Sequence, residues 1–176
     1  NSNPWKHNYK NAIDLKQFGK SNYNPWNKTF LNELNIYKCF RFMDFGLINN
    51  QNPKYAKPGT WNGKPEISWN DRNLETNPNQ SQVSIYWMID LCNRCNADMW
   101  LCIPELSDST WWTGAAQLIK NKLNPNLRIY VEYSNEVWND GFSAYHTAFE
   151  KGSDLNLWYQ GDNTEKRYAK DRCAAR

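Results

Sequence analysis

The sequence contains few of the features that mark membrane proteins or nucleic-acid-binding proteins. It has no run of 18 apolar residues and no run of five like charges, and its net charge is only +3. Without a long apolar run there is no candidate membrane span. Without a concentrated basic patch, a nucleic-acid surface is not expected. The sequence therefore predicts neither a membrane span nor a nucleic-acid partner, and its 176 residues are enough to bury a sizeable core.

The sequence is also poor in metal-ligand patterns. It has two His and five Cys, and the single CxxC, Cys92 and Cys95, lies inside an apolar helical run without a second CxxC. A structural zinc site normally needs four such ligands. Cys39 and Cys102 lie in strand-like runs and are expected to be buried thiols. We therefore predict neither a metal nor a cofactor.

Aromatic residues, in contrast, are abundant. They make up 15% of the chain, with ten Trp, many of them beside Asn, Pro or Asp in loop-like sequence. Two interpretations remain open: a large aromatic core, or exposed rings on which a ligand stacks.

Apolar spacing predicts alternating strands and helices from residue 37 onward. We expect strands at 37–45, 99–103 and 128–133, and helices at 13–18, 29–34, 83–96, 111–123, 142–151 and 164–176. Such alternation is typical of an α/β fold with a parallel sheet. Residues 1–36 are expected to form an N-terminal loop and helix segment before a domain spanning 37–176, in which 47–80 is a long irregular insertion. A loop of that length is usually functional or disordered.

The most informative stretch is RIYVEYSNEVWN, residues 128–139. Alternation along its strand places Glu132, Ser134 and Glu136 on one side. The strand gives way to polar residues at Asn135 and Glu136, and Trp138 follows shortly after. A carboxylate beside an amide and an indole suits sugar chemistry, because sugars offer hydroxyls to polar groups and C–H faces to rings.

Asn135-Glu136 after an apolar strand resembles the signature of the clan A glycoside hydrolases, which are (β/α)8 barrels. The string YVEYSNEVWN resembles a group of large secreted bacterial proteins with such a barrel. The resemblance implies an extracellular or secreted protein in which Glu136, at the end of the fourth strand, is the general acid/base. It also implies that Asn135 contacts the sugar 2-hydroxyl.

Two further stretches match the same family. RFMDF, residues 41–45, resembles the second strand, and DMWLCIPELSD, residues 98–108, resembles the third strand with its loop, although Glu105 stands where the family has His. The resemblance thus implies a partial TIM-barrel-like fold of about three parallel β-α units, the second to the fourth. A complete barrel needs about 250 residues, so we expect a piece of a longer protein, closed by the remainder of the barrel or by a partner chain.

Arg41, inside an aromatic strand, needs an acidic partner if it is buried, and Glu132 is the expected one. For Asp44, Asp71 and Asp108, contact with a sugar and a structural role remain alternatives: a turn cap, a pair with Arg72, and a helix cap, respectively. The predicted substrate-binding residues around Glu136 are Asn135, Trp138, Arg41, Asp44, Asp71, Glu105 and Asp108.

The sequence thus predicts a glycoside hydrolase-like domain that acts on a polysaccharide by retaining acid/base catalysis. The family's nucleophile, a Glu on the seventh strand, has no counterpart here, so we expect the chain alone to supply at most the acid and to be inactive. The alternative is a non-catalytic carbohydrate-binding or extracellular structural module descended from that fold. Glu136 could also be a structural carboxylate at a strand–loop junction.

Overall fold

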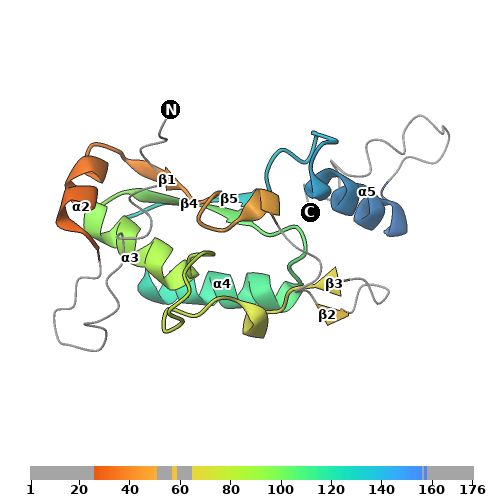
Figure 1. Cartoon of the computed structure of the whole chain (residues 1–176), viewed down its shortest axis with the longest axis horizontal. Helices are drawn as coiled ribbons and strands as arrows, with labels where there is room; N and C mark the ends of the chain where they lie inside the picture. Colours follow the sequence, from red (N-terminus) through yellow and green to blue (C-terminus); the bar gives the residue numbers. More distant parts are fainter. Residues whose placement is uncertain (1–25, 51–56, 59–64, 156, 158–176) are drawn as a thin grey trace.

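The computed structural model describes residues 26–50, 57–58, 65–155 and 157. The helices expected at 13–18 and 164–176 lie outside these residues. The centre of the fold is a sheet of three parallel strands in the order β1-β4-β5 (Figure 1). The strands are β1 (Cys39–Arg41), β4 (Asp98–Ile103) and β5 (Ile129–Tyr133). The predicted α/β alternation with a parallel sheet is confirmed, whereas a barrel remains a prediction.

Four α-helices accompany this sheet in the described part of the chain: α2 (Lys28–Leu34), α3 (Ile85–Cys95), α4 (Ser109–Lys122) and α5 (Ser143–Asp154). Three begin at an oxygen-bearing side chain that accepts a free backbone N–H of the first turn. Asn27 accepts from Thr29, Ser84 from Tyr86 and Asp108 from Trp111. These three caps fix where the helices start, within two residues of the predicted positions.

Helices α3 and α4 cover one face of the sheet (Figure 1). Met99 and Leu101 of β4 are buried on that face, and helix α3 contributes Trp87, Ile89 and Leu91 to the same core. Burying one such side chain stabilises the fold by about 1.5–3 kcal/mol. The opposite face, with Trp100 and Tyr130, is partly open to solvent, so its polar side chains can reach one another above the strands.

The described parts of the insertion after β1 contain short elements that the sequence does not predict. Its described elements are η3 (Ile48–Asn50), β2 (Lys57–Pro58), β3 (Pro65–Glu66) and η5 (Trp69–Asp71). The backbone of Ile67 bridges to the loop after β4, because its N–H donates to Leu106 at 2.7 Å and its carbonyl accepts from Asp108 at 3.0 Å. The insertion is therefore attached where the parallel strands end, the edge at which such folds keep their chemistry.

Trp69 anchors the insertion on α4. Its ring meets Trp111 edge-on at 6.3 Å and lies 4.0 Å beneath the guanidinium of Arg72. Gly114 leaves the space for it, since a Cβ at that position would stand 2.2 Å from the indole.

Strand β1 is shorter than expected. The sequence predicts a strand over 37–45, but the strand covers only Cys39–Arg41. Asp44 therefore does not end the strand and lies exposed in the turn that follows. That turn, with Leu47 at φ 52°, brings Ile48 into the interior, where it is almost fully buried. Burial of this side chain outweighs a longer pairing of the aromatic run with β4.

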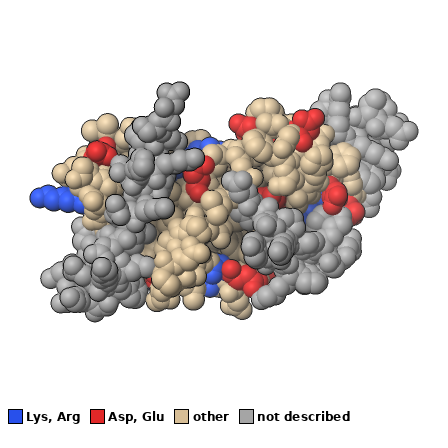
Figure 2. Space-filling model, in the orientation of Figure 1, with Lys and Arg blue, Asp and Glu red and all other residues tan. Residues whose placement is uncertain are grey.

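Among the described helices, none combines the length and the apolar character needed to cross a bilayer. On the face shown in Figure 2, the acidic and basic side chains of the described residues are scattered among uncharged ones and do not form an extended surface of one sign.

Candidate functional site

A bidentate ion pair spans the open face of the sheet. Arg41 on β1 donates from Nε and Nη2 to the carboxylate of Glu132 on β5, at 2.8–2.9 Å. Because β4 lies between the two strands, the pair crosses two strand spacings, roughly 9.6 Å. The predicted pairing of Arg41 with Glu132 is confirmed.

Glu132 is also the acceptor for the central strand. Trp100 donates from Nε1 at 2.9 Å and Cys102 from its thiol at 3.3 Å. Burial, reinforced by the neighbouring carboxylate, raises the pKa of Cys102 to about 12, so the thiol keeps the proton that it donates. With donors from both β1 and β4, the Glu132 carboxylate links the three strands on this face and has little capacity left for a substrate.

Arg41 is less buried than expected, with 34% of its side chain exposed, because this face of the sheet carries no helix layer in the described structure. Its guanidinium lies 5.3 Å from the ring centre of Trp100, a cation–π distance. Burial alone would lower its pKa, but the hydrogen bonds with Glu132 and the nearby negative charges, that of Glu136 included, raise it above the ordinary value.

Asn135 connects this ion pair to the end of β5. Its side chain is almost fully buried, with Oδ1 accepting from Arg41 Nη2 at 2.6 Å and Nδ2 donating to Asn49 Oδ1 at 3.0 Å. Both ends of the amide therefore have partners that fix its orientation. Asn135 therefore lies below the surface at the end of β5, where its amide stabilises the turn and is not exposed to solvent.

The turn that carries Glu136 is strained. Ser134 and Glu136 both adopt left-handed backbone angles, with φ of 53° and 45°, a region that costs a non-glycine residue on the order of 1–2 kcal/mol. Asn139 stabilises the turn by donating its backbone N–H to the Glu136 carbonyl at 2.8 Å and Nδ2 to the carboxylate at 3.0 Å. Such strain is commonly retained where a side chain must point in one direction.

Trp138 lies beside this carboxylate in sequence and is 67% exposed. A second indole, Trp112 in the first turn of α4, is also exposed, and its Nε1 donates to the buried hydroxyl of Ser107 at 2.7 Å. Because this hydrogen bond uses the N–H at the edge of the Trp112 ring, only the face of the ring is available to a ligand. The strand ends thus present a half-buried carboxylate and two exposed indoles.

Glu105, in the loop after β4, is an internal group. It is 1% exposed and accepts hydrogen bonds from Ser143 at 2.8 Å and Ser134 at 3.4 Å. Burial raises the pKa of its carboxyl above the ordinary value, even though these hydroxyls and Lys151 lower it. Glu105 therefore joins the β4 loop to the Glu136 turn and to α5, and is not placed at the rim.

The remaining predicted residues have structural partners at the same edge. Asp108 caps α4, accepting from the Trp111 N–H at 2.9 Å, and Asp71 closes η5 by accepting from the Ser68 hydroxyl at 2.6 Å. Asp44 lies in the turn after β1, where its carbonyl accepts from the Leu47 N–H. The structure places these residues at the same edge of the sheet, and each of them has a structural role there.

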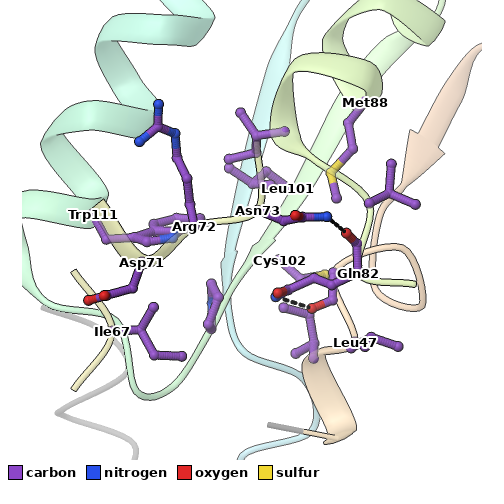
Figure 3. Close-up of a pocket in the computed structure, with 15 residues that line it drawn as sticks. Leu47, Ile67, Asp71, Arg72, Asn73, Gln82, Met88, Leu101, Cys102 and Trp111 are labelled. Atoms are coloured by element: carbon purple, nitrogen blue, oxygen red, sulfur yellow. Dashed lines mark hydrogen bonds between the residues drawn. The ribbon is translucent and has the colours of Figure 1, made fainter. Parts of the chain in front are cut away.

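A cavity of about 210 Å³ lies between the insertion and the end of β4, with Ile67, Met88, Leu101 and Trp111 among its apolar walls (Figure 3). The polar groups on one side bind each other or the backbone, as Gln82 Nε2 does with the Gly46 carbonyl at 3.1 Å. The cavity therefore suits an apolar group better than a sugar.

Sequence reasoning missed Asn49, Ser143 and the contact of Trp112 with Ser107. Trp100 and Cys102 could have been placed beside Glu132 from strand register, because they alternate on one face and Cys102 pairs directly with Glu132. Asn49 had no such signal, since the insertion has no apolar period.

Among the residues that the structure describes, no group of three or more His, Cys, Asp or Glu side chains is arranged to hold a metal ion. Comparisons with protein-family models, with curated proteins and with solved structures gave no match. The geometry of the site and the Asn135-Glu136 motif are therefore the observations that bear on function.

Proposed function

We propose that this chain handles a polysaccharide at the carboxyl edge of its sheet, with Glu136 as the acid/base of a glycoside hydrolase-like reaction. The observation that supports the proposal best is the half-buried Glu136 carboxylate, fixed by Asn139 and followed by the exposed ring of Trp138. An extracellular location belongs to the same proposal, because an enzyme that acts on polysaccharides outside the cell must be secreted.

The roles follow from the chemistry of the groups. The indole of Trp138 offers a flat apolar surface to the C–H face of a sugar ring. Glu136 protonates the leaving glycosidic oxygen, and its conjugate base then activates water. A retaining reaction also needs a second carboxylate about 5–5.5 Å away. Glu132 and Glu105 are poor candidates for that role, because the first accepts four donors and the second is buried.

Because this chain is expected to supply only the acid, release of reducing sugar from a panel of soluble polysaccharides is assayed with the second carboxylate supplied by the remainder of the barrel or by a partner chain. Glu136→Gln should abolish release, whereas Glu33→Gln, an exposed Glu on α2, should leave the rate unchanged. Release that survives in Glu136→Gln would remove Glu136 from the acid/base role.

The engagement of Glu132 and Glu105 favours a second candidate function, glycan binding without hydrolysis. In this case Glu136 is a hydrogen-bond acceptor for a sugar hydroxyl and the proton chemistry is absent. Retarded migration in gels containing each polysaccharide would detect binding. Glu136→Gln should still be retarded, because the amide oxygen also accepts, and a complete loss of retardation in this variant would count against the candidate.

A further inference from the structure

We propose that Asn49, in η3 of the insertion, is a positioning residue that orients Asn135 and, through it, the turn carrying Glu136. Nothing in the sequence motif points to Asn49, which lies 86 positions from Asn135. The inference rests on the proposed function where it concerns ligand affinity, but the geometry of the turn can be tested without a ligand.

The two ends of the Asn135 amide are held by different parts of the fold. Oδ1 accepts from Arg41, which is itself fixed by the bidentate pair with Glu132. Nδ2 donates to Asn49 Oδ1 at 3.0 Å. The Arg41 side therefore stays in place when Asn49 changes, whereas the Nδ2 side depends on the acceptor that Asn49 provides.

Asn135 is the middle residue of the strained turn. The residues on both sides of it, Ser134 and Glu136, have left-handed φ, and such backbone persists only where neighbouring contacts determine it. The Asn135 side chain ties the centre of this turn to β1 and η3. If the Nδ2 contact is lost, the turn can relax, and the Glu136 carboxylate then loses its fixed direction beside Trp138.

Three variants separate this role from a general effect of mutation. Asn49→Ala removes the acceptor, Asn49→Asp keeps an oxygen at the same place, and Asn126→Ala changes an exposed Asn in the turn before β5. The direct readout is the rate at which the Asn135 side-chain N–H protons exchange with water, measured by NMR and assigned with Asn135→Asp. Loss of one hydrogen bond should speed this exchange about five- to tenfold.

We expect faster exchange in Asn49→Ala and an unchanged rate in Asn49→Asp and Asn126→Ala. Exchange in Asn49→Ala at the wild-type rate would overturn the proposal, and so would equal acceleration in Asn49→Asp or Asn126→Ala. Retardation by a polysaccharide that binds the wild type should weaken by a similar factor in Asn49→Ala alone. If the wild type binds none of the polysaccharides, the proposed function fails, while the exchange rates still decide the role of Asn49.

Discussion

Arg41 on β1 and Glu132 on β5 are joined across the intervening strand β4, which adds donors of its own from Trp100 and Cys102. The pair links the two outer strands across the open face of the sheet. It also places the Arg41 guanidinium where it can hold Asn135 beneath the Glu136 turn. A structural ion pair and a candidate sugar site therefore share one side chain.

Replacing Arg41 by Met should destabilise the protein by about 1–3 kcal/mol, because Glu132 loses its charged donors while its carboxylate stays half-buried. The loss should shrink in about 1 M NaCl, where the half-exposed pair is screened. Urea unfolding measures both effects. Arg94→Met breaks the pair with Asp90 one helical turn away and should cost only about 0.5 kcal/mol. Equal losses of unfolding free energy in Arg41→Met and Arg94→Met would show that the Arg41 ion pair stabilises the fold no more than a surface pair within one helix.

Glu105 should make stability depend on pH. Its pKa in the folded protein lies above the ordinary 4.5 because of burial, so the folded state holds the proton more tightly than the unfolded state. The stability that it contributes is complete below about pH 4.5 and is lost as pH rises through the raised pKa. Glu105→Gln, which stays neutral and can keep the contact with Ser143, should remove this loss.

The measurement is the free energy of unfolding of the wild type and Glu105→Gln over a pH series. The free energy of unfolding of Glu105→Gln should rise relative to that of the wild type as pH rises. The free energy of unfolding of Glu33→Gln, whose side chain is exposed on α2, should differ from that of the wild type by the same amount at every pH. If the difference in free energy of unfolding between Glu105→Gln and the wild type is also the same at every pH, burial does not raise the pKa of the Glu105 carboxyl.

Gly114→Ala should destabilise the protein although it places a better helix former in α4. Ala normally gains about 1 kcal/mol over Gly inside a helix, but here the added Cβ would stand 2.2 Å from the Trp69 ring. Urea unfolding should therefore show a loss for Gly114→Ala in the wild type and a gain for the same change in a Trp69→Ala background. A gain in both backgrounds would mean that Trp69 does not pack on Gly114.

The helices and central strands could be predicted because local signals agree with the fold. Ser84 and Asp108 mark the helix starts, and the continuous apolar run Met99–Ile103 marks a strand. The run suggests cover on both faces, but in the described structure helices cover only one face and Trp100 is exposed on the other. The Arg41–Glu132 pair could also be predicted, since an Arg in an aromatic strand and a Glu in a parallel one each need a partner.

Features that depend on tertiary packing could not be predicted. The early end of β1 follows from the burial of Ile48, which the aromatic run does not reveal. Glu105 was expected at the rim because it follows a strand, but the hydroxyls of Ser134 and Ser143, one of them on α5, draw it inside. Asn49 reaches Asn135 from an insertion without apolar periodicity, so only the folded chain brings them together.

The central claim is that sugars bind at the edge formed by Glu136 and Trp138. Gel retardation by soluble polysaccharides tests it most directly. Trp138→Ala is compared with Tyr37→Ala, because Tyr37 is also an exposed aromatic residue but precedes the start of β1, at the other edge of the sheet. We predict that at least one polysaccharide retards the wild type and Tyr37→Ala, and that Trp138→Ala migrates as if no polysaccharide were present. Retardation that is unchanged in Trp138→Ala, or a wild type that no polysaccharide retards, would contradict the account.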